Sequence, residues 1–500
     1  MTHMNFILSI IPIVILLILL LRFRMSIKKA AFISLFYTIF ASVYLGADEK
    51  LIAVSFGKGL WMTLWIIYII WPALFVYKLI DSTGGFRVIE KKFRSFSDKL
   101  LQLLMLGWVF PSFLQGVTGF GTPVAVTAPL LMGMGYSPVV SAMVPLIGCA
   151  WAVTFGSMGS SYLAAKLVTQ LTPEESLIFA AFAAFFLSII CVLTGFVISY
   201  IYGGFKAIKK GFFYILILGI SMGITLNVMV RIEPAIASFT SGIVGLISGF
   251  LLIPRNRSED TGKMSFSYAF LPYYVLIASV LLIMLTPLSS FAKTHFILGF
   301  SFPETSTRIW TNPAIELYNP IRFFAHPGSF ILFSGIVSYI FYRKRGMSIE
   351  TGKILKETTV RTIPSFISIF AIVSLSTLMM DSGMISVLAH KSAFFLFPFL
   401  SPLIGTLGTF ITGSNTSSNM LFGAFQYTTA KNMGIDPLLI LGSQTAGGAI
   451  GKVFSPTDMV LAASVTNILG KEGEIMRFTV KIGITFTVLI GILTMLIVIS

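Results

Sequence analysis

The chain has 500 residues, of which 56% are hydrophobic and only 11% are charged, and its mean hydropathy is +0.92. This composition excludes a soluble globular protein and predicts an all-α polytopic membrane protein. The net charge of +16 fits basic loops held on the cytoplasmic side, so no nucleic-acid partner is expected.

Apolar windows, taken in chain order, predict about twelve transmembrane helices. The first window, Asn5 to Leu21, is followed rather than preceded by basic residues. Because a cleaved signal peptide has the opposite order, we expect a retained helix with the N-terminus outside. The windows are about 5–21, 30–47, 58–80, 138–163, 175–203, 211–230, 234–254, 266–287, 327–342, 362–388, 437–465 and 477–499.

Two further apolar stretches, about 100–133 and 393–430, carry Gly, Thr and Ser in their middle, which favours re-entrant hairpins over continuous helices. In this layout 24 of the 35 Lys and Arg residues fall on inner loops, against nine outside and two within spans. The first hairpin then enters from the cytoplasm and the second from outside. The halves 1–230 and 231–500 are therefore predicted to form an inverted repeat, with both termini outside and an extracellular loop over 288–326 that folds as a small cap.

The two halves share a spaced motif at these hairpins. Each copy reads Thr-Gly-x-x-Thr and then Met-Gly-x-x-Pro, with a Gly ten residues and a Phe seventeen residues after that proline. The copies begin at Thr118 and Thr412. A duplicated broken-helix element of this kind points to the binding site of a secondary transporter.

The hairpin tips are suited to an anion. Glycines in the first tip, from Gln115 to Pro123, let the backbone approach a ligand, and the helix N-terminus that follows favours a carboxylate. The second tip, from Ser414 to Asn419, adds hydroxyls and amides. The alternative is that these small residues only permit tight helix packing.

The span after each hairpin is interrupted, at Phe155-Gly156-Ser157-Met158-Gly159 and at Phe454-Ser455-Pro456, and unwound backbone there can also line the site. Pro456 could instead simply kink a packed helix. The predicted substrate-binding residues are Thr118, Gly119, Phe120, Gly121, Thr122, Ser414, Asn415, Thr416, Ser417, Asn419, Gly448, Lys452 and Ser455.

Lys452 falls within the span 437–465, where a charge is costly and usually functional. We interpret it as a counter-charge for a carboxylate substrate. An ion pair with Asp458 and a side chain that reaches the cytoplasmic surface remain as alternatives. Lys58, near the outer end of its own span, is expected to reach the surface, and Asp381 is either a coupling residue or a helix-end cap.

Catalytic and metal signatures are lacking in the sequence. The two cysteines lie in apolar segments, and none of the four histidines is near an acid or a cysteine at metal-ligand spacing. No Ser-His-Asp set or paired carboxylates share one side of the membrane. We therefore expect no enzyme activity, no catalytic residues, no metal and no cofactor.

At the hairpin tips and the interrupted span after the second hairpin, the chain resembles the L-lactate permease family of proton-coupled transporters. The segments Gly116 to Gly135 and Gly405 to Lys481 carry the resemblance most strongly. It implies uptake of L-lactate, and also of D-lactate or glycolate, with protons across the bacterial cytoplasmic (plasma) membrane. It also implies an elevator-type arrangement, in which a mobile transport domain carries both hairpins against a scaffold.

Two positions depart from the family pattern. Gln115 stands where the family commonly has an acid, and Asn415 where its second tip commonly reads Ser-Asp-Thr. An amide cannot carry a coupling proton, and Ser-Asn-Thr also resembles the signature of sodium-coupled dicarboxylate carriers. The ion-coupling candidates are therefore Gln115, Asp381, Asn415 and Asp458.

Two rival functions follow from these observations. The first is a Na⁺-coupled di- or tricarboxylate carrier with the same fold, so the coupling ion is H⁺ or Na⁺. The second, of a different class, is a channel or a membrane scaffold. The expected partners are a small carboxylate and the lipid bilayer, and assembly as a homo-oligomer is left open.

Overall fold

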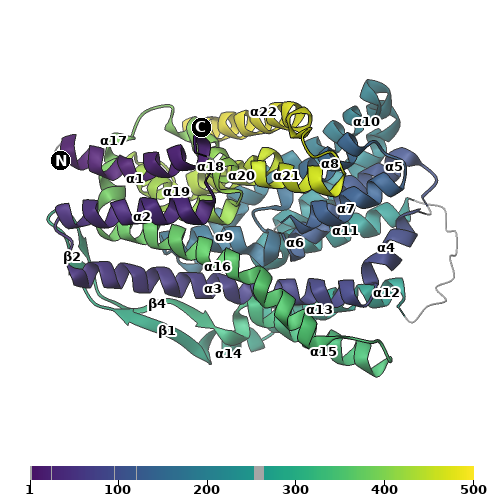
Figure 1. Cartoon of the computed structure of the whole chain (residues 1–500), viewed down its shortest axis with the longest axis horizontal. Helices are drawn as coiled ribbons and strands as arrows, with labels where there is room; N and C mark the ends of the chain where they lie inside the picture. The colour runs from purple at the N-terminus through teal and green to yellow at the C-terminus, as the bar shows by residue number, and fades with distance from the viewer. Residues whose placement is uncertain (1–2, 24, 95, 120, 253–263) are drawn as a thin grey trace.

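The computed structural model describes residues 3–23, 25–94, 96–119, 121–252 and 264–500. Its helices run mainly along the long axis of the molecule (Figure 1). Within the described ranges, eight helices are long and apolar enough to cross a membrane, or up to ten if two bent pairs each count as one span. The chain is thus built as a multi-pass membrane protein, although fewer helices than the twelve expected meet this criterion.

The N-terminal helices follow the predicted windows closely. They are α1 (His3–Leu21), α2 (Ile27–Tyr44) and α3 (Glu49–Ser82), followed by the short, basic α4 (Gly85–Arg94). The windows 175–203 and 211–230 become α10 (Pro173–Ile232), which is interrupted by non-helical backbone at Gly203 and Gly204. The break falls at the predicted boundary, so the two windows lie on either side of it.

Both predicted hairpin segments fold as neighbouring helices, and their re-entrant character stays a prediction. In the first half they are α5 (Lys99–Leu104), the π-helical η1 (Met105–Val109), α6 (Phe110–Val117) and α7 (Thr122–Gly133), followed by α8 (Pro138–Gly148), η2 (Ala150–Ala152) and α9 (Gly156–Thr169). In the second half they are α18 (Phe397–Thr412) and α19 (Asn415–Asn432), followed by α20 (Pro437–Gly451), η5 (Lys452–Phe454), α21 (Pro456–Val465) and α22 (Glu472–Ile499). The spans after both hairpins are therefore broken, as the sequence predicts.

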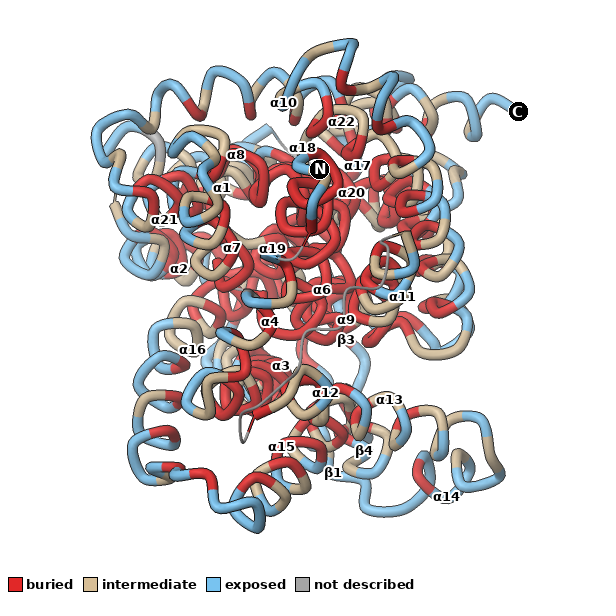
Figure 2. Tube along the Cα trace, turned by 90° about the vertical axis from the view of Figure 1, so that its right-hand side faces the viewer, coloured by how far each residue is buried: buried red, intermediate tan, exposed pale blue. Residues whose placement is uncertain are grey.

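The remaining helices connect the two halves and surround the hairpins. They are η3 (Pro234–Ile236), α11 (Ala237–Leu251), α12 (Phe266–Ala269), α13 (Leu271–Met284), α14 (Leu288–Thr294), η4 (Phe323–Ala325), α15 (Pro327–Lys344), α16 (Thr351–Asp381) and α17 (Met384–Lys391). Figure 2 shows α6, α9, α19 and α20 at the buried centre, while α14 and α15 expose much of their surface. Polar hairpin sequence therefore lies inside the protein, where its backbone can be satisfied away from lipid.

The expectation of an all-α protein needs one correction, in the loop 288–326. There β1 (Ile297–Phe302) pairs antiparallel with β4 (Ile315–Arg322), and β2 (Thr305–Ser306) pairs with β3 (Thr311–Asn312). The alternation of apolar and polar residues in this loop suits a strand that covers helices on one face. The strands β1 and β4 lie beside α3 (Figure 1), where Trp61 Nε1 donates a hydrogen bond to the Tyr318 carbonyl at 3.0 Å.

The matched glycines of the motif have the same packing role in the two halves. A Cβ at Gly148 would lie 1.8 Å from the Gly107 carbonyl oxygen, and a Cβ at Gly447 would lie 2.0 Å from the Pro402 carbonyl oxygen. In each half, the span after the hairpin therefore touches the backbone of that hairpin's first arm. This likeness supports the inverted repeat, which stays a prediction together with the boundary at residue 230.

A buried ion pair joins α3 to α16. Lys58 Nζ lies 3.0 Å from Asp381 Oδ1, and both side chains are at most 3% exposed. Ser55 donates a hydrogen bond to the second carboxylate oxygen, and Asn312 of β3 donates one to the Asp381 backbone carbonyl. The prediction that Lys58 reaches the surface was wrong, because its partner lies 323 residues away in the sequence.

Removing one partner of this pair should destabilise the fold. Asp381→Asn leaves the Lys58 charge buried without a counter-charge, which costs about 3–5 kcal/mol of unfolding free energy. Lys58→Met with Asp381→Asn should recover most of that loss. The measurement is reversible unfolding in mixed detergent micelles.

The matched control is Lys78→Met, which breaks the ion pair of Lys78 with Glu357, a pair more exposed than Lys58 with Asp381, and should cost about 0–1 kcal/mol. Equal losses in the Asp381 and Lys78 variants would show that the buried pair contributes no more than a surface pair.

Candidate functional site

The first hairpin turns at Gly121, which has a left-handed backbone (φ +77°) and precedes the first residue of α7. A Cβ at this position would lie 2.4 Å from Leu461 Cδ2, so the tip rests against α21. The N-terminus of α7 therefore points its free amide groups into the same region as α21.

The second hairpin turns at Gly413, also left-handed, which ends α18. Ser414 then caps α19, and its hydroxyl accepts a hydrogen bond from the Ser417 amide at 3.3 Å. A Cβ at Gly413 would lie 2.5 Å from Thr457 Oγ1. Since Thr457 and Leu461 are four residues apart on one face of α21, both tips contact the same helix.

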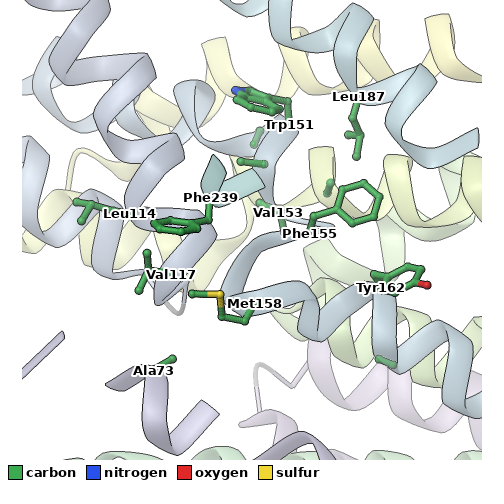
Figure 3. Close-up of a cluster of buried hydrophobic side chains, with 14 of the residues drawn as sticks. Ala73, Leu114, Val117, Trp151, Val153, Phe155, Met158, Tyr162, Leu187 and Phe239 are labelled. Carbon is green, nitrogen blue, oxygen red and sulfur yellow. The ribbon is translucent and has the colours of Figure 1, made fainter. Parts of the chain in front are cut away.

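The break at the start of α9 forms a third wall of the space between the two hairpin tips. Ser157, Met158 and Gly159 are three consecutive residues with left-handed backbone, which non-glycine residues rarely adopt. The Tyr162 amide donates to the Thr154 carbonyl at 3.0 Å across this break. Figure 3 shows Val153, Phe155 and Met158 among the buried apolar side chains that surround it.

These segments enclose a cavity of about 280 Å³, which we call the hairpin cavity. Most of its lining residues carry a hydroxyl or an amide group, although apolar atoms contribute the larger share of the cavity surface. The lining residues are Gln115, Gly121, Val153, Ser157, Ser160, Ser161, Thr412, Gly413, Ser414, Asn415, Thr416, Lys452, Thr457, Asp458 and Leu461.

Among the described residues that line the cavity, Lys452 and Asp458 are the only ones with ionisable side chains. Lys452 Nζ donates a hydrogen bond to Gln115 Oε1 at 3.3 Å. Asp458 lies on the first turn of α21, where the helix dipole favours a carboxylate, and its buried Oδ2 has no hydrogen-bond partner in the described parts of the chain. No ion pair within 4.0 Å joins Lys452 to Asp458 in the described chain, so the predicted pairing alternative is not formed.

Asn415 is held rigidly at the N-terminus of α19. Its Nδ2 donates to the Thr445 carbonyl at 3.1 Å and to Thr154 Oγ1 at 3.3 Å. Its Oδ1 is buried and has no partner among the described residues. A Cβ at Gly448 would lie 2.0 Å from that oxygen, so the glycine is what allows Asn415 to occupy this position.

The cavity brings together about half of the predicted site residues. Those that line it are Gln115, Gly121, Ser414, Asn415, Thr416, Lys452 and Asp458. Those that do not are Thr118, Gly119, Thr122, Ser417, Asn419, Gly448, Ser455 and Asp381, whereas Phe120 lies outside the described residues.

Several of the predicted residues that do not line the cavity make structural contacts instead. The Thr118 hydroxyl donates back to the Leu114 carbonyl of its own helix, and the Ser455 hydroxyl contacts that of Thr457 at 2.9 Å. Asn419 Nδ2 donates to the Ser161 carbonyl and so ties α19 to α9. Asp381 is committed to Lys58 and not to the cavity.

Several lining residues were not predicted: Val153, Ser157, Ser160, Ser161, Thr412, Gly413, Thr457 and Leu461. Ser157 lies in the break that the sequence predicts, and Thr412 and Gly413 belong to the repeated motif, so these three had a signal. Ser161, whose hydroxyl lies 3.1 Å from that of Thr416, is an ordinary helical serine in the sequence. Val153 and Leu461 are indistinguishable in sequence from other apolar residues of a span.

A multi-pass helical bundle with a buried polar cavity between two hairpin tips is the construction of a membrane transport protein. The sequence profile described as L-lactate permease matches residues 5–499, and the chain belongs to the L-lactate permease family.

Relatives and a solved structure accompany this match. An L-lactate permease of Salmonella typhi is 31% identical and covers 90% of this chain and 87% of its own length. Escherichia coli K12 has an L-lactate permease that is 32% identical (89% and 86% covered) and a glycolate permease that is 30% identical (98% and 94% covered). The solved structure of the Alcanivorax borkumensis YdaH transporter is 13% identical, with a TM-score of 0.49 over 90% of this chain and 87% of that chain.

The contact between Gly448 and Asn415 yields a test of the site geometry. Gly448→Ala should destabilise the protein by about 1–3 kcal/mol, because the new methyl group overlaps Asn415 Oδ1. Adding Asn415→Ala removes that oxygen and should recover most of the loss. Unfolding in detergent measures both variants, and non-additivity of the pair is the expected signature.

Gly473→Ala in α22 is the matched control, since a Cβ there meets nothing within 4 Å. If Gly448→Ala behaves like Gly473→Ala, the close approach of Asn415 to α20 is incorrect.

Proposed function

We propose that the protein is a secondary active transporter that imports a small 2-hydroxy monocarboxylate with protons across the bacterial cytoplasmic membrane. L-lactate is the proposed substrate, with D-lactate and glycolate as further substrates. The observation that carries the proposal is the hairpin cavity, in which one lysine ammonium lies among hydroxyls and helix N-termini. The names of the relatives, L-lactate permease and glycolate permease, support the substrate class.

The cavity offers separate partners for the two ends of such a substrate. The carboxylate would be bound by Lys452 Nζ and by the amide groups at the start of α19. The 2-hydroxyl would be bound by the hydroxyls of Ser161 and Thr416, which can both donate and accept.

The charge of the cavity favours a monocarboxylate over the di- or tricarboxylate alternative. Lys452 is the only basic side chain in the lining, and Asp458 already supplies one negative charge. A dianion would bring a second uncompensated carboxylate into a buried site, which is strongly unfavourable.

Asp458 is the proposed proton carrier, since Gln115 and Asn415 are amides and cannot titrate. With Asp458 ionised, its charge and that of Lys452 cancel in the empty cavity. Protonation of Asp458 leaves the cavity positive, so the proton and the substrate anion each favour binding of the other.

This charge arithmetic also gives the reason for coupled transport. The empty cavity and the cavity that holds both a proton and a monoanion are neutral, whereas a cavity with only one of them carries a net charge. Moving a net charge through the apolar part of a membrane is costly, so the two neutral states are the ones that reorient. Both tips rest on α21, and we propose that they move together with it, elevator-like, against a scaffold that includes α3, α15 and α16, with both chain termini outside.

Uptake into proteoliposomes tests the function. An inward proton gradient should drive accumulation of radiolabelled L-lactate, and unlabelled glycolate should compete. Lys452→Met should lower uptake by at least about tenfold, because a buried charge-assisted contact to a carboxylate contributes on the order of 1.5–3 kcal/mol. Lys431→Met, at the exposed end of α19, is the control and should transport normally.

Accumulation that follows a Na⁺ gradient and ignores pH would favour the sodium-coupled alternative. Flux that does not saturate with substrate would indicate a channel instead of a carrier.

Removing the titratable group should separate exchange from accumulation. Asp458→Asn keeps a neutral side chain in the cavity, so counterflow of labelled against unlabelled lactate should persist. Accumulation driven by the proton gradient should fall to background. Both fluxes are measured in the same proteoliposomes.

Glu350→Gln removes an exposed carboxylate at the start of α16 and serves as the control. Proton-driven accumulation that survives in the Asp458→Asn protein would assign the coupling proton to another group.

A further inference from the structure

A second cavity, of about 260 Å³, lies beside the hairpin cavity, and we call it the outer chamber. It is formed by the last turns of α9, the start of α10, η3, α14, and the segment from β4 to the start of α15. The charge layout of the sequence places all of these chain segments on the outer side of the membrane. Its charged lining residues are Lys166, Glu233, Lys293 and Arg322.

The outer chamber has an excess of positive charge. Three basic groups and one carboxylate lie within electrostatic range of one another, and none of them forms an ion pair within 4.0 Å in the described part of the chain. Only nine Lys and Arg residues fall on the outer side in the predicted layout, and three of these line this one cavity. A concave cluster with an excess of one sign of charge concentrates ions of the other sign.

His326 adds a hydrogen-bond donor to the wall of the chamber. Its Nδ1 accepts a hydrogen bond from the Gly328 amide at 3.1 Å, so the proton of the neutral ring lies on Nε2. That Nε2 is buried and has no partner among the described residues, and the side chain is only 2% exposed. The ring is fixed between Trp65 and Tyr68, with centroid distances of 4.3 and 4.7 Å.

Neighbouring residues of α9 line the outer chamber and the hairpin cavity. Ser161 lines the hairpin cavity, the next residue, Tyr162, lines the outer chamber, and Lys166 follows Tyr162 by about 6 Å along the helix. On the opposite side, Asn319 Nδ2 donates to the Leu167 carbonyl at 3.3 Å, so the outer loop covers this end of α9.

We propose that the outer chamber is a second binding site for a small carboxylate anion, which holds the substrate on its way to the hairpin cavity. The inference rests on the proposed function for the identity of the anion. Lys293 and Arg322 attract the carboxylate, the His326 Nε2–H donates to it, and Leu163 and Leu177 offer apolar surface to its carbon chain.

Charge-selective thiol labelling tests the chamber without depending on transport. Leu177→Cys is introduced on a background of Cys149→Ala and Cys191→Ala, which removes both native thiols. A sulfonate-bearing methanethiosulfonate should react about tenfold faster than a trimethylammonium-bearing one, because the chamber is positive. L-lactate at millimolar concentration should slow the anionic reagent.

Lys293→Gln with Arg322→Gln should remove both the preference and the protection, whereas Arg322→Lys should keep them. Arg308→Gln, an exposed outer residue that does not line the chamber, is the matched control and should change neither. A preference that persists after both neutralisations overturns the proposal. Protection by phosphatidylglycerol and not by lactate would assign the site to a lipid headgroup and also overturn it.

Uptake measurements distinguish this proposal from the proposed function. The doubly neutralised protein should show a KM for L-lactate raised about 3- to 10-fold with little change in maximal rate, because capture is weakened and the hairpin cavity is intact. An unchanged KM contradicts the outer chamber. Failure of the unmodified protein to transport lactate contradicts the proposed function instead, while the labelling preference still decides whether the chamber binds anions.

Discussion

A backbone that leaves its helix inside a membrane must have its amide and carbonyl groups covered by protein, and the rest of this structure depends on that requirement. Three interruptions, at Gly121, Ser157 and Gly413, line one cavity, and a fourth, at Ser455, lies between the lining residues Lys452 and Thr457, so the surrounding helices shield all four from lipid. The same interruptions produce the helix N-termini that make the cavity suitable for an anion. The need to shield interrupted backbone and the need for an anion-binding surface therefore both place the polar sequence around the hairpin cavity.

Two lysine–aspartate combinations show how distance decides the role of a buried charge. Lys58 and Asp381 are in direct contact with further hydrogen bonds, so neither charge is available to a ligand. Lys452 and Asp458 line the same cavity without forming an ion pair, and within the described ranges one oxygen of Asp458 has no hydrogen-bond partner. The first combination joins two helices, whereas the second leaves both charged groups facing the hairpin cavity.

The hairpins, the broken spans and part of the site could be predicted because Gly, Thr and Ser interrupt apolar sequence at matched places. Asn415 and Lys452 could be predicted as site residues for a similar reason, because a polar or charged residue is conspicuous in an apolar segment. The role of Lys58 could not be predicted, because its partner is distant in the sequence. The role of Ser161 could not be predicted either, because the sequence does not show which face of its helix a serine occupies. The outer chamber is assembled from several segments that are far apart in the sequence, so only the folded chain reveals it.

The contact between Gly448 and Asn415 has a consequence for how this lineage can change. A side chain at residue 448 would overlap the asparagine at position 415. A substitution at 448 is therefore tolerated after a change at 415, but not before it. A relative that replaces the amide by a smaller residue could afterwards enlarge position 448 and reshape the cavity. The residue at position 415 thus determines which substitutions position 448 accepts, and relatives with and without the asparagine would diverge in different directions.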